Sequence, residues 1–524
     1  MKSFSLQELR LALTRAIETR PGDSALVEIL ARLVDAAGDE GDAEALVDAV
    51  SLSMDIEERA QAADACLVLY HRSNAWSLLQ VVRHDAGNAH AWEQPELLNQ
   101  IYWLRAAIQH EGFEKLSVGR RSQIFCNLGN ALSSLGRVVE AIAEWRSSLR
   151  ELSSHGMARG NLGMGLFRYA TALSDNGHAY WLLKGAKDEL LNAINGGAEK
   201  DGSTYPEALE AFNRYLEYTE QYLARYEDWN QDEPERTRRS KTKKEGRYRD
   251  WCVHETLYLN PLNDLKPAHF AAEDALRLPS HRVDGVGITY RAFFNQLKQE
   301  YAYARWCLHE GLEARTIHFA DKHLHLELNC DLALYSMGIE QVKTAFRCAY
   351  SLLDKVAYFV NDYWHVGWSK KKVSFREVWY KEKKKGAPVT SLRPIFEASR
   401  NPYLRGLFWL SKDVYLERLQ DVADPSAKES DALRNHMEHK FMKVVDTMRT
   451  DEYSSEMLND HLGHLVQRDE LLSKSEHVLK MSRAALIYLS LAMRYEELFG
   501  PSAVGPKQLV MPFDFGLYPD DLKL

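Results

Sequence analysis

The sequence predicts an all-α protein made of two helical parts. Apolar residues recur at three- and four-residue spacing along most of the chain, which is the period of an amphipathic helix. Strand-like alternation of apolar and polar residues is rare in the first 225 residues. A chain of 524 residues also exceeds what one hydrophobic core usually supports, so we expect two or three domains.

The composition is typical of a globular protein in water and predicts a cytoplasmic location. Hydrophobic residues make up 45% of the chain and charged residues 27%. The sequence has no apolar run of roughly 18 residues or more, and its start lacks the apolar stretch of a signal peptide. The six cysteines are scattered without a C-x-x-C pair, which argues against a disulfide framework and against a cysteine zinc site.

The acidic excess is confined to the first part of the chain. Residues 1–225 carry 22 Lys and Arg against 31 Asp and Glu, whereas residues 226–524 carry 44 of each. The net charge of -9 therefore belongs entirely to the first part. We expect nucleic-acid contacts in the second part, where local basic clusters lie.

A short repeat organises the helices expected in residues 1–228. Asn127-Leu128-Gly129 recurs as Asn161-Leu162-Gly163 at an offset of 34 residues. The first copy belongs to a set of large and small residues placed as in a tetratricopeptide repeat: Phe125, Leu128, Gly129, Leu132, Gly136, Ala141 and Trp145. The region resembles a tetratricopeptide-like α-solenoid, which implies a concave surface for a peptide, a protein or another ligand. A helical scaffold that only supports the rest is the alternative.

The chain changes character at residues 229–246, which we interpret as a charged linker. This segment is almost wholly polar, contains Pro234 and Gly246, and turns from acidic to strongly basic. It separates the helical repeats from a second domain at residues 247–505, which a tail at 506–524 follows. The basic run is expected to be a solvated loop, with RNA contact or a protease-sensitive hinge as alternatives.

Helical periodicity marks most of the second domain. After an irregular segment at 251–265, helices are expected from near Gly285, and a long core helix is expected at 327–364. A basic segment between Lys370 and Arg400 contains Pro and Gly and is predicted to be an exposed insertion. Its candidate RNA-binding residues are Lys370, Lys371, Lys372, Lys383, Lys384 and Lys385.

Further helices are predicted at residues 404–421, 426–449 and 471–498. Asp424 and Pro425 supply an N-cap residue and a proline at the start of the middle helix. The apolar residues of this helix occupy one stripe, which is expected to face the core: Leu433, Met437, Phe441, Val444 and Met448.

The helix at 426–449 carries the strongest functional signal, an R-N-x-x-x-H pattern formed by Arg434, Asn435 and His439. Arg is followed five positions later by His at three other places, but only here does Asn follow Arg within a capped helix. A guanidinium binds phosphate and an imidazole transfers protons near neutral pH, as metal-free RNA cleavage requires. Asp431, Asn435 and His439 share one face, because they are spaced four residues apart.

Residues 246–505 resemble the HEPN superfamily (higher eukaryotes and prokaryotes nucleotide-binding), many of whose members are ribonucleases of bacterial toxin and antiphage systems. The likeness rests on the R-N-x-x-x-H motif and on residues 257–264, 346–359 and 484–492. It implies a four-helix bundle, here with insertions. It also implies that two bundles pair over one composite cleft, so a chain with a single motif would have to form a homodimer.

The resemblance also implies roles for the motif residues. His439 would be the general acid and base in attack of a 2'-OH on the adjacent phosphate. Arg434 would stabilise the charge of the phosphorane, and Asn435 would orient the imidazole or bind phosphate. Acidic residues that would support the site are Asp431, Asp354 and Glu438. RNA cleavage would need neither a metal nor a cofactor and would leave a 2',3'-cyclic phosphate. The protein would act as a toxin or antiphage effector, and a trigger bound by the helical repeats would control it.

Two other functions fit part of the pattern. The protein could be a non-catalytic dimeric adaptor that binds a protein or a nucleotide. It could also be a metal-dependent hydrolase, because three histidines cluster at residues 318–325, namely His318, His323 and His325. In addition, His436 lies three residues before His439. The sequence contains no H-E-x-x-H motif and no phosphate-binding G-x-x-x-x-G-K-[ST] motif.

Overall fold

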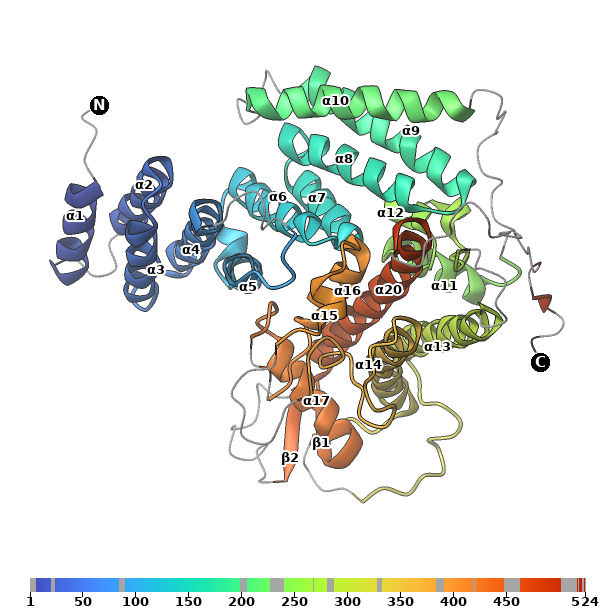
Figure 1. The fold of residues 1–524 in the computed structure, drawn as a ribbon. Coiled ribbons are helices and arrows are strands. Elements are labelled where there is room, and N and C mark those ends of the chain that lie inside the picture. Colours follow the sequence, from blue (N-terminus) through green and yellow to red (C-terminus); the bar gives the residue numbers. More distant parts are fainter. Residues whose placement is uncertain are drawn as a thin grey trace. The chain divides into compact units, whose positions relative to one another are not determined.

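Figure 1 shows the computed structural model of the chain. Apart from a few isolated positions, the structure describes residues 6–19, 24–83, 90–197, 205–226, 240–266, 268–279, 287–327, 332–382, 391–417, 421–446 and 462–500. Helices make up most of these residues, and only two short strands occur among them, which confirms the predicted all-α class. Single helical turns occur at η2 (Phe113–Lys115), η3 (Ala193–Gly197), η4 (Ala224–Tyr226) and η5 (His269–Ala271). No described helix is long and apolar enough to cross a membrane.

Contacts between residues divide the chain into two compact units, and neither unit is continuous in the sequence. Unit 1 comprises Met1–Thr171, Ala179–Gln231 and Trp379–Leu433. Unit 2 comprises Ala172–His178, Asp232–Val378 and Arg434–Leu524. Unit 1 therefore combines the predicted repeat region with a segment from the second half of the sequence. The domain limits expected from the sequence stay predictions.

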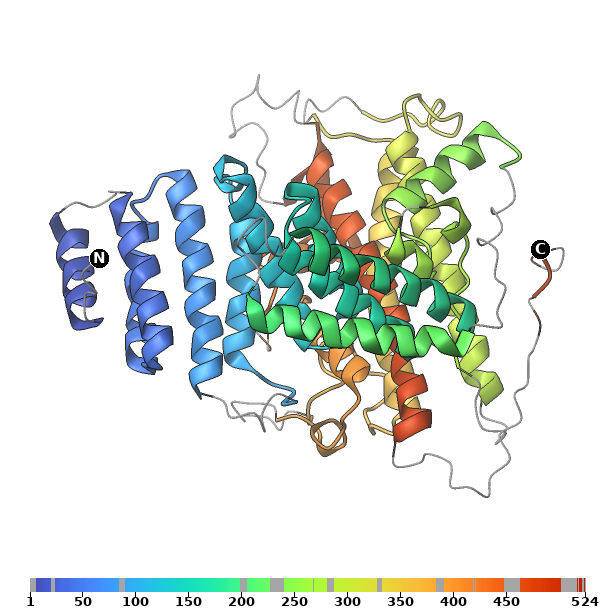
Figure 2. The same cartoon turned by 90° about the horizontal axis from the view of Figure 1, so that it is seen from above.

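The first helices of unit 1 follow one another, and each packs against its neighbour in the sequence (Figures 1 and 2). They are α1 (Leu6–Thr19), α2 (Ala25–Glu40), α3 (Ala43–Glu57), α4 (Ala62–Arg83) and α5 (Pro95–Gln109). The apolar faces of α1 to α4 share one core, in which Leu13, Leu30, Leu33 and Leu46 are fully buried. The Asp42 carboxylate begins α3 by accepting hydrogen bonds from the backbone N–H groups of Glu44 and Ala45, at 2.9 and 3.0 Å.

The two copies of the sequence repeat lie in the next helices of unit 1. These helices are α6 (Val118–Ser134), α7 (Val138–Glu151), α8 (Gly156–Ala172), α9 (Asn176–Asn192) and α10 (Pro206–Leu223). A Cβ added to Gly129 on α6 would lie 2.6 Å from Trp145 Nε1 on α7. A Cβ added to Gly163 on α8 would lie 2.6 Å from Leu190 Cγ on α9. Both glycines allow two helices to approach closely, which explains why glycine stands at this position in both copies of the repeat. The tetratricopeptide assignment stays a prediction.

The segment Trp379–Leu433 packs within unit 1, so the exposed insertion predicted at 370–400 is wrong in part. Phe375, Trp379 and Phe396 are buried. Four rings pack together with paired centroids 5.1 to 6.2 Å apart: Trp92, Trp379, Phe396 and Phe408. Burial of this aromatic surface outweighs the basic, Pro- and Gly-containing character of the segment. Its helices are α15 (Pro394–Glu397) and α16 (Pro402–Ser411), so the helix predicted at 404–421 ends at Ser411.

Buried ion pairs tie this segment to α5 and to the turn between α6 and α7. Asp413 accepts hydrogen bonds from Arg105 at 2.6 Å and from Arg137 at 2.5 Å, and at most 13% of any of these side chains is exposed. Gly136 has a φ of +82° in this turn, and a Cβ there would lie 2.0 Å from the carbonyl oxygen of Pro402. Charge pairing and close backbone packing therefore both hold the segment in unit 1.

Three long helices form the centre of unit 2 and pack against one another: α13 (Gly287–Glu313), α14 (Met337–Tyr363) and α20 (Arg468–Phe499). The helix predicted from Glu327 begins ten residues later, where the Ser336 hydroxyl accepts a hydrogen bond from the Ile339 N–H at 3.3 Å. The shorter helix α12 (Pro261–Leu265) is tied to α20 by a buried pair between Asp264 and Arg483 at 2.8 Å.

The last residues of the predicted linker are helical. Helix α11 (Lys243–His254) starts within the range 229–246, where the Thr242 hydroxyl accepts a hydrogen bond from the Glu245 N–H at 3.1 Å. The preceding linker residues, 229–239, lie outside the described part of the chain.

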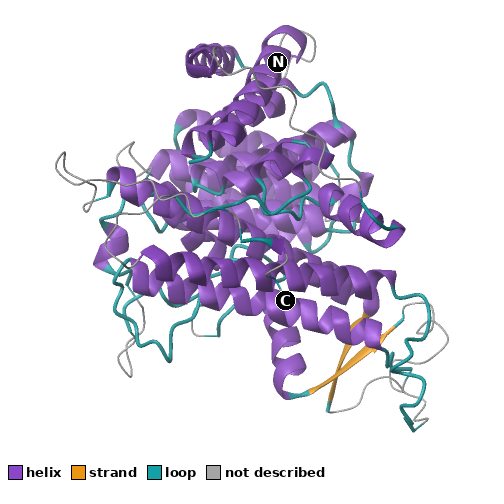
Figure 3. Ribbon diagram, turned by 90° about the vertical axis from the view of Figure 1, so that its right-hand side faces the viewer, coloured by secondary structure: helices purple, strands orange, loops and turns teal. Residues whose placement is uncertain are grey.

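The helix predicted at 426–449 ends ten residues early, and a strand follows it (Figure 3). Helix α17 (Ala427–His439) is followed by β1 (Phe441–Val445), which pairs in parallel with β2 (Gly463–Gln467). Phenylalanine and valine favour such a strand, and β1 gains backbone hydrogen bonds from β2 that a longer helix would lack. The predicted stripe therefore ends with α17 as a helical face, and among its described members only Phe441 is wrongly placed in the core. Leu433 is buried, Met437 is half-buried and Phe441 is 42% exposed. Val444 is buried from β1, and Met448 lies outside the described residues.

Candidate functional site

The Arg434 side chain is held by two residues of α14. Its guanidinium Nη2 lies 3.4 Å from Asp354 Oδ2. Its guanidinium carbon lies 4.6 Å from the centre of the Tyr350 ring, which is a cation–π contact. Tyr350 and Asp354 are four residues apart on one helix, so their side chains point from the same face. One turn of α14 therefore positions the cation of the motif.

Asp354 has two partners that stabilise its charged form in a partly buried place. The backbone N–H of Phe375 donates a hydrogen bond to Asp354 Oδ1 at 2.9 Å, and Arg434 faces Oδ2. Burial nevertheless raises the pKa of Asp354, and the hydrogen bond and the Arg434 charge offset this only in part. The sequence left Asp354 and Asp431 as alternative acidic residues, and the structure brings Asp354 next to Arg434.

The other motif residues lie at the exposed end of α17. His439 is the last residue of the helix, and its side chain is exposed, as are those of Asn435 and Glu438. Arg434 and His439 are five residues apart, which separates them by about 140° around the helix axis and about 7.5 Å along it. Within one chain the guanidinium therefore turns toward α14, while the imidazole faces outward.

Sequence reasoning missed a second imidazole beside the motif. The rings of His436 and His464 are stacked with centroids 4.5 Å apart and planes 23° from parallel. His464 lies on β2, opposite Met442 of β1. Burial lowers the pKa of His464, and the neighbouring His436 lowers it further. The sequence signal for this contact is weak, because it depends on the strand pairing that follows α17.

The predicted basic residues fall into two groups. Lys370, Lys371 and Lys372 are exposed, and Lys370 pairs with Asp362 at 3.1 Å. Lys383, Lys384 and Lys385 lie outside the described residues.

The three histidines that cluster at residues 318–325 are exposed and do not form a metal site. His318, His323 and His325 lie in the segment that follows α13. Among the described residues, no group of three or more His, Cys, Asp or Glu side chains could hold a metal ion.

Comparison with known proteins gives one match, to the family described as LA2681-like HEPN, over residues 283–496. The match includes α13, α14, α17 and α20, and with them the whole R-N-x-x-x-H motif. No curated protein and no solved structure matches the chain. The resemblance to HEPN expected from the sequence is confirmed over residues 283–496, which are similar to the LA2681-like HEPN domain.

Proposed function

We propose that this protein is a metal-independent endoribonuclease that acts as a homodimer. A HEPN domain suggests a nuclease, another RNA-related function or a nucleotide-binding adaptor. The observation that carries the nuclease proposal is the position of Arg434 against Asp354 and Tyr350, within a complete R-N-x-x-x-H motif. A guanidinium that is already oriented needs little reorganisation when charge develops on a phosphate.

In the proposed reaction, a ribose 2'-oxygen forms a bond to the adjacent phosphorus while the bond from phosphorus to the 5'-oxygen breaks. His439 removes the 2'-hydroxyl proton, and a protonated imidazole donates a proton to the departing 5'-oxygen. Arg434 stabilises the negative charge of the phosphorane, and Asn435 orients the imidazole or binds a phosphate oxygen. The products carry a 2',3'-cyclic phosphate and a 5'-hydroxyl.

The ion pair at Arg434 suits a cation that must bind a phosphate. Its 3.4 Å separation is longer than the roughly 2.7–2.9 Å of a strong charge-assisted hydrogen bond. The Arg434 side chain is also 39% exposed, so an RNA phosphate can reach it. Asp354 and Tyr350 then act as positioning residues, which hold the guanidinium until the substrate arrives.

The proposal extends to substrate binding and control. Lys370, Lys371 and Lys372 are exposed cations that can follow an RNA backbone, and Lys383 to Lys385 are proposed for the same role. The helical repeats bind a protein or ligand trigger that controls the nuclease, and the protein acts as a toxin or antiphage effector.

The decisive experiment is cleavage of total RNA by the full-length protein in EDTA, followed by analysis of the fragment ends. Wild-type protein is expected to produce 2',3'-cyclic phosphate ends. Arg434→Ala and His439→Ala are each expected to lower the rate by about 100-fold or more, because each removes a group that acts in the transition state.

His254→Ala is the matched control. His254 also stands five residues after an arginine, and its side chain is 82% exposed, but it lies outside the motif. The variant should cleave like the wild type. Loss of all activity in EDTA, or full activity of His439→Ala, would contradict the proposal.

A non-catalytic adaptor is the second candidate, and the separation of the two motif side chains within one chain favours it. Arg434 turns toward α14, while the exposed His439 lies at the end of α17. An adaptor would bind a protein or a nucleotide, lose that binding in Arg434→Ala, and leave the RNA intact after activation in cells.

A further inference from the structure

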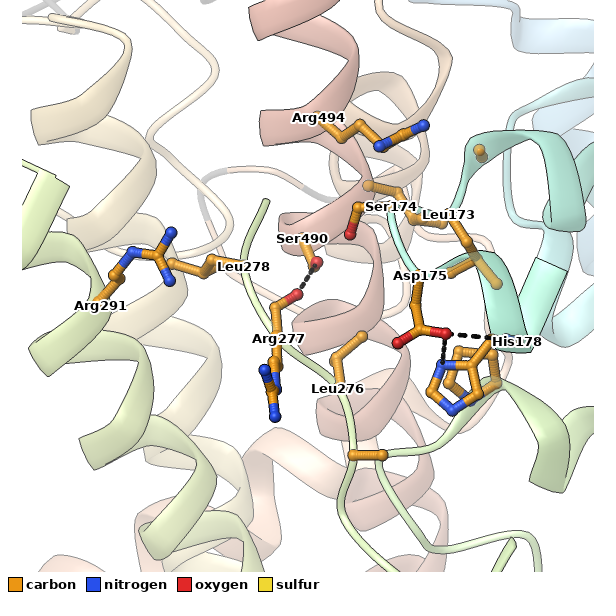
Figure 4. Close-up of a pocket in the computed structure, with 14 residues that line it drawn as sticks. Leu173, Ser174, Asp175, His178, Leu276, Arg277, Leu278, Arg291, Ser490 and Arg494 are labelled. Carbon is orange, nitrogen blue, oxygen red and sulfur yellow. Dashed lines mark hydrogen bonds and ion pairs between the residues drawn. The ribbon is translucent and has the colours of Figure 1, made fainter. Parts of the chain in front are cut away.

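A cavity of about 230 Å³ lies in unit 2, away from the R-N-x-x-x-H motif. It is lined by residues of the turn between α8 and α9, of the segment 275–278, and of helices α12, α13 and α20 (Figure 4). Its apolar lining includes Leu173, Leu276, Leu278 and Leu491. Five chain segments thus line a space that the proposed nuclease reaction does not use.

Cationic side chains reach this cavity from different directions. Arg291 extends from α13 and Arg494 from α20, and Figure 4 shows them on separate sides of the pocket. Both side chains are half-buried, and the exposed Arg277 adds a third guanidinium to the lining. Half-buried arginines attract anions more strongly than fully exposed ones, because less water screens their charge.

The acidic residue of the lining is directed elsewhere. Asp175 accepts a hydrogen bond from the backbone N–H of His178 at 2.9 Å and lies 3.7 Å from its Nδ1. This carboxylate therefore caps the N-terminus of α9. Three arginines against one engaged carboxylate leave the lining with a net positive charge.

We propose that this cavity binds a small phosphorylated compound. A phosphate group presents oxygens in several directions and accepts charge-assisted hydrogen bonds from a guanidinium, whereas a carboxylate offers only two oxygens in one plane. The leucines provide an apolar surface for the organic part of the ligand. Ligand cavities usually measure roughly 300–1,000 Å³, so this smaller one fits a small molecule rather than a macromolecule.

The test is calorimetric titration of the full-length protein with inorganic pyrophosphate, and with citrate as the carboxylate probe. Pyrophosphate is expected to bind once per chain and at least about tenfold more tightly than citrate. Arg494→Gln and Arg291→Gln should each weaken pyrophosphate binding by about tenfold or more, because each removes a charge-assisted contact.

Two further variants make the result interpretable. Arg32→Gln is the matched control, since Arg32 is a half-exposed arginine on α2 that pairs with Glu28. It should leave binding unchanged. Ser174→Trp keeps every charge but places a large ring at the cavity, and it should abolish binding even if an arginine variant fails to fold.

The proposal is overturned if pyrophosphate does not bind saturably, if citrate binds equally well, or if Arg32→Gln weakens binding as much as Arg494→Gln. Binding of single-stranded RNA but not pyrophosphate through Arg494 would also overturn it. The titration does not involve RNA cleavage, so its outcome is separate from that of the proposed nuclease function.

Discussion

Arg434 depends on two residues that are distant from it in the sequence. Tyr350 lies under the guanidinium and Asp354 beside it, and both belong to one turn of α14. Two contacts of different kinds restrict a side chain more than either alone, since the ring fixes the guanidinium plane and the carboxylate fixes its direction. The position of Arg434 is therefore set by the packing of unit 2.

Removal of the Asp354 charge is expected to slow cleavage without removing a catalytic group. Asp354→Asn should lower kcat roughly ten- to hundredfold, because a guanidinium displaced by about 1 Å stabilises the phosphorane poorly. Single-turnover cleavage of a fluorescent RNA measures this effect. Glu340→Gln on the same helix is the control, since its carboxylate is exposed and pairs with Lys343. An unchanged rate in Asp354→Asn would remove Asp354 from the site.

The stacked histidines predict a measurable coupling. Burial and His436 both lower the pKa of His464, so His436→Ala should raise that pKa toward its usual value. Titration of the His464 imidazole by NMR measures the shift. No change in the pKa would show that the two rings do not interact in solution.

The stacked pair of His436 and His464 makes the free energy of unfolding depend on pH, and the direction of this dependence is known. The folded-state pKa of His464 is lowered, so folding favours the neutral ring. The stabilisation of the folded state by the neutral His464 ring is complete when the pH is above the ordinary histidine pKa. It is lost as the pH falls through the lowered pKa of His464 in the folded state. The effect on the free energy of unfolding should stay below about 1 kcal/mol, because water screens these half-exposed rings. Urea unfolding of wild type and His464→Asn at neutral and acidic pH measures it.

At the scale of the elements, helical spacing located most helices but not all their ends. The run Phe441-Met442-Lys443-Val444-Val445 continues the apolar phase of α17, yet it forms β1. A period of 3.6 cannot exclude a short strand whose partner lies more than twenty residues further on. The Arg434–Asp354 contact and the His464 ring were beyond sequence reasoning for the same reason, because each depends on pairing between distant segments.

Substitution of alanine for two different glycines of α6, Gly129 and Gly119, is expected to change the stability of unit 1 in opposite directions. Gly129→Ala should destabilise unit 1 by about 1–3 kcal/mol, because its Cβ would lie 2.6 Å from Trp145 Nε1. This indole cannot easily move, since it donates a hydrogen bond to Asn130 at 2.9 Å. Gly119→Ala meets no atom within 4 Å and should be neutral or stabilising by up to about 1 kcal/mol. Thermal unfolding compares the two, and equal effects would contradict the close approach of α6 and α7.

Among the substitutions considered in unit 1, removal of the Asp413 carboxylate is expected to cause the largest loss of stability. Asp413→Ala would leave Arg105 and Arg137 buried without their shared carboxylate, which should cost about 3–5 kcal/mol. Glu397→Gln is the control in the same segment, since Glu397 is exposed on α15 and its substitution should cost about 0.5 kcal/mol or less. Urea unfolding followed by tryptophan fluorescence measures both. Similar losses in the two variants would mean that the segment Trp379–Leu433 does not depend on the buried pairs.

At the scale of the whole molecule, the two-part organisation expected from the sequence is only partly visible in the contacts. The repeat region and the HEPN match at residues 283–496 are separate in the sequence, but Trp379–Leu433 lies inside the match and packs in unit 1. Composition could not predict the packing of this segment in unit 1, because its lysines and glycine suggest an exposed segment although it also contains aromatic residues. Trp92 and Arg105 belong to the same cluster as Trp379 and Asp413, and only the folded chain brings them together.

The geometry of α17 sharpens the prediction of a homodimer. Arg434 turns toward α14 while His439 lies at the exposed helix end, about 140° away around the axis. One motif therefore presents its two reactive groups to different surroundings, and we propose that a second copy completes a site that contains both. We expect specific RNA cleavage per chain to fall steeply as the protein is diluted below its dimer dissociation constant, and to follow the dimer fraction measured by light scattering. His254→Ala should show the same concentration dependence as the wild type, because it leaves the motif intact. Activity per chain that stays constant while the protein becomes monomeric would show that one chain is sufficient, and the composite site would have to be abandoned.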